Sequence, residues 1–163
     1  MFHFKRSLLV ILLITFCSVQ AQDESEPGLC KKRKLEKWEE LANKGKYKDA
    51  IDELVNYINI NPKKNKHRDY WHLGQLYAFD DNYHKALKYF RKSTNIFDKL
   101  ADREWKLYYK GTIAFLKRDK DKLKRTIDKL LKMHSLYYKE NANRLKALYD
   151  NFEKTYLEAY TKN

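Results

Sequence analysis

Histidine, cysteine, serine and paired carboxylates are the side chains that could do chemistry in this 163-residue chain. Beyond the first 21 residues, the histidines have no spacing typical of metal ligands, and no His-Glu-x-x-His or Cys-x-x-Cys pattern occurs. No serine lies in a nucleophile elbow, and the isolated glycines form no phosphate-binding loop. Asp80-Asp81-Asn82 is more typical of a turn than of an acid–base pair. We therefore predict no catalytic residues, no metal site and no cofactor.

Basic side chains are the other chemical feature, with a net charge of +13. They cluster at Lys31–Lys34, at Lys63–Arg68 and at Lys117–Lys132. A lysine-rich helix face exposed to solvent is the ordinary explanation. The functional alternative is attraction to an acidic partner or to anionic lipid head groups. Nucleic acid is not expected as a partner, because no nucleic-acid-binding motif accompanies the charge.

The elements that must carry these side chains are helices. Hydrophobic residues make up 43% of the chain and aromatic residues 15%, while Gly (4) and Pro (2) are scarce. This composition disfavours disorder and turn-rich all-β folds. Two cysteines exclude a scaffold stapled by disulfides. We predict an all-α fold.

Residues 1–21 have the layout of a secretory signal peptide, with Lys5 and Arg6 before a short apolar run and Ala21 at the cleavage site. An uncleaved anchor and lipidation at Cys17 are the alternatives. Cleavage would lower the net charge to +11, because Lys5 and Arg6 leave with the segment, and Cys30 would remain either free or paired between chains. Residues 22–33 are predicted to be a flexible lead-in, and residues 34–163 one domain. We expect an exported protein, periplasmic or secreted, of a bacterial envelope.

Three pairs of helical segments follow one another in this domain. Apolar residues recur at helical spacing on both sides of short turns at 43–46, 80–82 and 118–119. The interval is 36 residues between Ala50 and Ala86 and 37 between Gly74 and Gly111. A period of this size indicates stacked antiparallel helical hairpins, with small residues where helices cross closely.

These residues resemble the tetratricopeptide repeat (TPR) family. The stretch from Tyr70 to Tyr77 and the stretch from Asn82 to Phe90 match the two halves of its pattern well. The first pair matches through 45–51 and Pro62, and the third keeps Gly111 and Ala114 but has Leu123 where the family has Ala. The resemblance covers residues 31–134 and implies a right-handed solenoid of about three hairpins. It also implies a role in protein–protein interaction.

The resemblance also implies where a ligand would bind. In that family the first helix of each hairpin lines a concave groove. The corresponding partner-binding candidates are Arg68, Trp71, Gln75, Phe79, Trp105, Tyr108 and Thr112. Aromatic and arginine side chains dominate binding hot spots. The alternative is that Trp71, Trp105 and Tyr108 simply pack against the neighbouring hairpin.

The last part of the chain is predicted to be one amphipathic helix. Its apolar stripe runs from Leu145 through Phe152 to Tyr160, and Lys146, Asp150, Lys154 and Glu158 lie opposite. Such a helix is typical of a solenoid cap. The alternative is a helix that binds a partner or a second copy.

Together these observations predict an exported, non-catalytic module of the TPR-like kind that binds a peptide or protein segment in its groove, with no transmembrane helix in the mature chain. The alternative is a basic peripheral protein that associates with an anionic membrane surface or another polyanion.

Overall fold

The computed structural model describes residues 35–62, 66–94, 103–133 and 139–162, and within these ranges it contains eight helices and no strand. The prediction of an all-α chain is therefore confirmed for the described residues. The predictions for residues 1–33, which concern the signal peptide, the lead-in and Cys30, lie outside them. The helices are α1 (Lys37–Asn43), α2 (Tyr47–Ile60), α3 (His67–Phe79), α4 (Tyr83–Ser93), α5 (Arg103–Leu116), α6 (Lys120–Leu131), α7 (Lys139–Asp150) and α8 (Tyr156–Thr161).

The turns inside the first three helix pairs share one hydrogen-bond pattern. Gly45, Asp81 and Arg118 each adopt a positive φ, and each lies two residues after the end of the first helix of its pair. In the first turn the Gly45 N–H donates to the Ala42 carbonyl and the Lys46 N–H donates to the Leu41 carbonyl, and both bonds recur in the other two turns. This is the Schellman arrangement, which satisfies the last carbonyls of a helix while reversing the chain.

A glycine lies where α3 and α4 pack closely. A Cβ atom on Gly74 would lie 2.8 Å from a ring carbon of Phe90. Helices α3 and α4 therefore could not keep their present separation with a larger residue at position 74. Ala50, Ala86 and Leu123 occupy equivalent positions at the start of α2, α4 and α6 and are all fully buried. The substitution of Leu for Ala in the third pair is therefore accommodated in the core.

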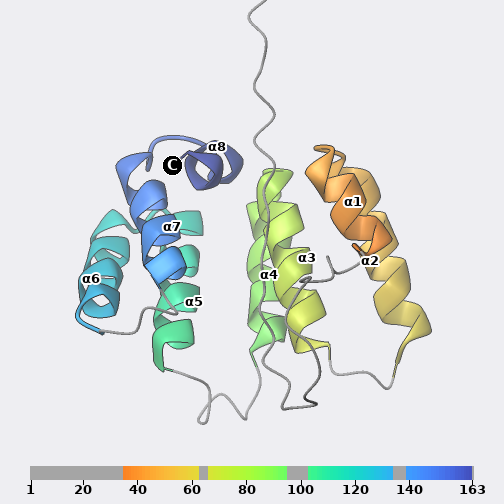
Figure 1. The fold of residues 1–163 in the computed structure, drawn as a ribbon, viewed down its shortest axis with the longest axis horizontal. Helices are drawn as coiled ribbons and strands as arrows, with labels where there is room; N and C mark the ends of the chain where they lie inside the picture. The colour runs from red at the N-terminus through yellow and green to blue at the C-terminus, as the bar shows by residue number, and fades with distance from the viewer. Residues whose placement is uncertain (1–34, 63–65, 95–102, 134–138, 163) are drawn as a thin grey trace, which may run out of the picture.

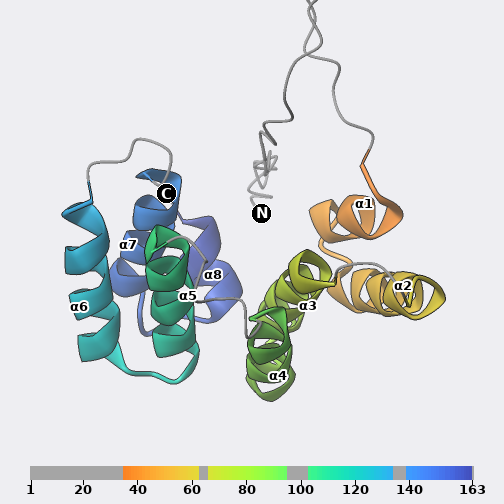
Figure 2. The ribbon, with the colours of Figure 1, turned by 90° about the horizontal axis from the view of Figure 1, so that it is seen from below.

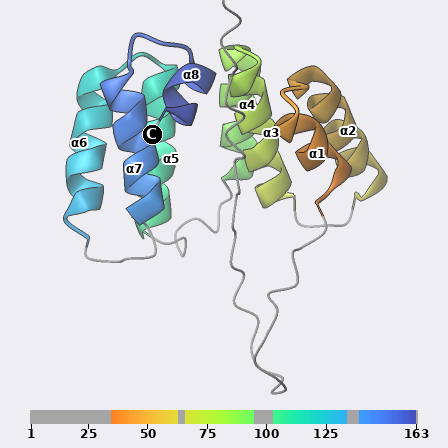
Figure 3. The ribbon, with the colours of Figure 1, turned by 45° about the horizontal axis from the view of Figure 1, so that its top comes forward.

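Helices that are neighbours in the chain are neighbours in space. Figure 1 shows α1 and α2, then α3 and α4, then α5 and α6 in order across the molecule, and the view from below in Figure 2 shows the same order. Helix α2 packs on α3, and α7 packs on both α5 and α6. Helix α8 lies beside α7 and reaches back to α3 (Figure 3).

The prediction of a single C-terminal helix is wrong. The chain leaves the helical conformation after Asp150 and starts a new helix at Tyr156. Thr155 caps that second helix, and its N–H donates to Glu158 Oε2 at 3.1 Å while the Glu158 N–H donates to Thr155 Oγ1 at 3.3 Å. This reciprocal capping box lets the chain change direction, so α7 continues along α5 and α6 while α8 turns toward α3.

Candidate functional site

The residues that sequence analysis singled out lie on α3 and α5, and we call their common surface the candidate face. It comprises Arg68, Trp71, Gln75 and Phe79 of α3 with Trp105, Tyr108 and Thr112 of α5. Trp71, Gln75, Tyr108 and Thr112 are buried, Phe79 and Trp105 are partly buried, and the Arg68 side chain is 66% exposed. The face is therefore mostly covered within the chain itself.

Trp71 joins the two helices of the candidate face. Its ring centre lies 4.6 Å from that of Phe90, 4.7 Å from that of Trp105 and 5.6 Å from that of Tyr108. These are the separations of favourable aromatic pairs. Trp71 thus packs against the neighbouring helix pair, the packing alternative left open above, and only 5% of its surface remains exposed.

Helix α8 covers the end of the candidate face that lies away from Arg68. The ring of Phe79 is 5.5 Å from the ring of Tyr156 and 5.4 Å from that of Tyr160. The backbone N–H of Tyr156 donates to the hydroxyl of Tyr83, the first residue of α4, at 2.8 Å. The candidate face therefore already holds a helical segment.

A polar centre lies beneath α8. The Tyr156 hydroxyl lies beside Gln75 and Thr112. Burial raises the pKa of Tyr156 well above its ordinary value, and this effect outweighs the lowering of the pKa by these two neighbours. Within the described part of the chain, neither Tyr156 Oη nor Thr112 Oγ1 makes a hydrogen bond of normal geometry, although both are fully buried. Buried polar groups without such bonds are uncommon and costly.

Arg144 of α7 holds the other end of α8. Its guanidinium donates to the backbone carbonyl of Tyr160 at 3.1 Å and lies 5.0 Å from the centre of that tyrosine's ring. Tyr108 lies nearby, and burial raises the pKa of its hydroxyl well above the ordinary value, with the neighbouring hydroxyl of Tyr160 adding to the rise. Helix α8 is therefore fastened at both of its ends.

His72 extends the polar centre toward α1. Its Nδ1 lies 3.3 Å from Gln75 Oε1, and its ring centre lies 5.0 Å from that of Trp38. Burial lowers the pKa of His72, and the nearby Arg68 lowers it further, while the hydrogen bond with Gln75 acts in the opposite direction. The imidazole is therefore favoured in its neutral form.

Four residues of this arrangement were not predicted from the sequence as site residues. Tyr156 and Tyr160 of α8 contact the candidate face, and Tyr83 and Arg144 hold α8 in place. One signal was present in the sequence. Thr155 and Glu158 have the Thr-x-x-Glu spacing of a capping box, which marks a helix start inside the segment that we predicted to be continuous. No local pattern could show that the new helix would reach α3.

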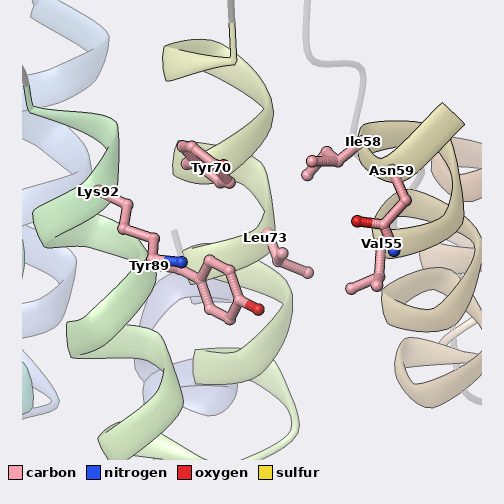
Figure 4. Close-up of a pocket in the computed structure, with 7 residues that line it drawn as sticks. All are labelled: Val55, Ile58, Asn59, Tyr70, Leu73, Tyr89 and Lys92. Carbon is pink, nitrogen blue, oxygen red and sulfur yellow. The ribbon is translucent and has the colours of Figure 1, made fainter. Parts of the chain in front are cut away.

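A hollow lies between α2, α3 and α4 (Figure 4). It is lined by Val55, Ile58, Asn59, Tyr70, Leu73, Tyr89 and Lys92. The ammonium group of Lys92 lies 5.6 Å from the ring centre of Tyr70 and 5.4 Å from that of Tyr89, so it stacks against the aromatic wall. We assign no ligand to this hollow, because its lining residues indicate no particular class of ligand.

Basic side chains are exposed on α4 and α6. Helix α4 carries Lys85, Lys88, Arg91 and Lys92 and no acidic residue. On α6 the exposed Lys124 pairs with Asp128 at 3.6 Å. The association with an anionic surface stays a prediction.

The described residues show neither a group of three or more His, Cys, Asp or Glu side chains that could hold a metal ion nor a helix long and apolar enough to cross a membrane. No protein-family model, curated protein or solved structure matches this chain. The resemblance to the TPR family therefore rests on the residues quoted above.

Proposed function

We propose that this protein is an exported, non-catalytic interaction module of the TPR-like kind, built as a solenoid of three helical hairpins, that binds a peptide or protein segment at the candidate face. The repeated turns support the hairpin assignment. Gly45, Asp81 and Arg118 occupy the same place in three Schellman motifs and are separated by 36 and 37 residues, the period of the sequence pattern.

One observation carries the binding role: α3 and α5, which form the candidate face, hold a short helix, α8, together with Tyr83 of α4. Phe79 and Tyr83 contact Tyr156 directly, and the polar side chains of Gln75 and Thr112 lie beside its hydroxyl. A surface that combines aromatic rings with a few polar groups is typical of a helix-binding site. The same chemistry suits a segment of another protein.

The open end of the candidate face is where such a partner would make first contact. Arg68 lies one helical turn before Trp71, its side chain is exposed, and its Nε lies 3.9 Å from the buried Asp69 carboxylate. Trp105, whose ring packs against that of Trp71, is only partly buried. An exposed arginine beside aromatic rings is the composition of a binding hot spot.

A photo-crosslinking residue placed at position 68 tests the proposal. The control places the same residue at Lys124 on α6, whose side chain is 59% exposed against 66% for Arg68. In the cells that make the protein, we expect position 68 to capture a defined protein that position 124 does not. Identical products from the two positions, or none from position 68, would refute binding at the candidate face.

A further inference from the structure

We propose that α8 is an exchangeable occupant of the candidate face, and that the partner which competes with it is a short helix carrying two tyrosines at the spacing of Tyr156 and Tyr160. This inference rests on the proposed function and names the partner chemistry of the same site. From the sequence we predicted that this face binds a partner, but not that α8 occupies it.

Another helix could form the hydrogen bonds that hold the two ends of α8 in place. The Tyr83 hydroxyl accepts a hydrogen bond from the Tyr156 N–H, and Arg144 donates one to the Tyr160 carbonyl. Both bonds go to backbone groups, at the first and fifth residues of the segment. Any helix of this length presents an N–H and a carbonyl at these places. The two hydrogen bonds therefore favour a partner of this length in helical form.

The side-chain contacts select for tyrosine. The Tyr156 ring lies 5.5 Å from that of Phe79 and 5.8 Å from that of Phe115, with its hydroxyl beside Gln75 and Thr112. The Tyr160 ring lies against Phe79 and under the Arg144 guanidinium. Tyrosine combines an apolar ring with a polar tip and so suits both places. Residues four apart lie on one face of a helix, which gives the required pattern.

Two features make exchange feasible. Helix α8 has only six residues, so it owes its helical form to docking, because isolated helices of this length are unstable in water. Its interface is also imperfect, since Tyr156 Oη and Thr112 Oγ1 are buried without a hydrogen bond of normal geometry. Two buried groups of this kind weaken the docking of α8 and so lower the cost of its release.

The segment before α8 has an anchor of its own. The Arg118 guanidinium lies 4.4 Å from the ring centre of Phe152 and donates to the Lys154 carbonyl at 3.4 Å. These contacts involve neither Tyr156 nor Tyr160. Helix α8 could therefore leave the candidate face by a change at Thr155 while α7 and the loop that follows it stay in place.

A labelled peptide with the sequence of residues 155–162, added to the whole protein, tests the proposal. Tethered α8 competes at a high effective concentration, so we expect weak binding to the wild type. Tyr160→Ala weakens the docking of α8 and should raise the affinity for the peptide about ten-fold or more, because more molecules have a free face. A peptide with both tyrosines replaced by alanine should not bind either protein.

Tyr149→Ala is the matched control. Tyr149 lies on α7, where its ring packs beside Lys120, so its loss removes a ring of the same size away from the candidate face. We expect its affinity for the peptide to equal that of the wild type. Equal affinity of all three proteins, or no binding to any, would mean that α8 is a permanent cap and would overturn the proposal.

A second measurement needs no substitution. In isotope-labelled wild-type protein followed by nuclear magnetic resonance, saturating unlabelled peptide should speed the hydrogen exchange of the amides from Leu157 to Thr161 by about ten-fold or more, while the amides of α5 stay unchanged. Unchanged exchange in α8 would overturn the proposal. A partner captured at position 68 with no such exchange would leave the proposed function standing and remove only the role of α8.

Discussion

At the scale of single residues, the candidate face is distinguished by polar groups held among aromatic rings. Gln75 connects two of them, because its side chain lies within reach of both His72 and the Tyr156 hydroxyl. The hydroxyls of Tyr156 and Thr112 lose water on folding and make no hydrogen bond of normal geometry within the described residues, which costs stability. Such an arrangement suits a surface that recognises a segment better than it suits a core that only holds helices together.

Replacement of His72 by Gln should flatten the pH dependence of stability. Burial lowers the pKa of His72 from its ordinary 6.5, so the unfolded chain binds the proton more readily than the folded chain does. The wild type should therefore lose stability as the pH falls from about 7.5 to about 5.5, and the variant should lose less. Urea unfolding at the two pH values measures this. Equal losses in the two proteins would contradict the assignment.

At the scale of helices, the arrangement depends on how each helix ends and on how closely neighbouring helices cross. Three equivalent turns reverse the chain within the pairs, and the capping box at Thr155 redirects it before α8. Where the helices cross, the distance between them is limited by single side chains, as for Gly74 against Phe90. Turn chemistry therefore sets the direction of each helix, and small residues set how closely the helices pack.

Gly74→Ala should destabilise the protein although alanine is the better helix former. The new methyl group would lie 2.8 Å from the fully buried Phe90 ring, and such overpacking costs about 1–3 kcal/mol, against a gain in helix propensity of about 1 kcal/mol. In a Phe90→Leu background the same substitution should cost less. A double-mutant cycle of unfolding free energies measures the difference. Strictly additive effects would show that the two residues do not limit the crossing.

At the scale of the whole molecule, the described residues of the α1–α4 and α5–α8 parts contact each other through aromatic rings of α3 and α5 and through α8. The rings of Trp71, Trp105 and Tyr108 join α3 to α5, and α8 spans from its own part to Phe79 and Tyr83. The residues that the sequence offers as ligand contacts are therefore also those that connect the two parts. Binding at the candidate face and the coupling between these parts would depend on the same side chains.

Trp71→Ala should lower the free energy of unfolding by about 3–5 kcal/mol and weaken the coupling of the two parts. Trp38→Ala is the control, since Trp38 is only partly buried and packs against His72 within the α1–α4 part. Denaturant unfolding followed by both fluorescence and circular dichroism should give coincident transitions for the wild type and separated ones for Trp71→Ala. A loss no larger than that of Trp38→Ala would contradict the bridging role.

The amino-acid sequence by itself determined the helical class, the turns and much of the core. Helical periodicity placed Ala50, Leu54 and Phe90 inside, and the turn preferences of Gly, Asp and Asn predicted the reversals at 43–46 and 80–82. These features depend on residues close together in the chain, so local patterns are enough to predict them.

Only the tertiary structure decided what covers the candidate face. Periodicity shows that Tyr156 and Tyr160 lie on an apolar side of a helix, but not which surface meets that side. The capping box at Thr155 redirects the chain, and the outcome depends on contacts with Phe79 and Tyr83, more than seventy residues earlier. An apolar stripe indicates that one side of a helix is buried. Which surface covers that side depends on the fold of the whole chain.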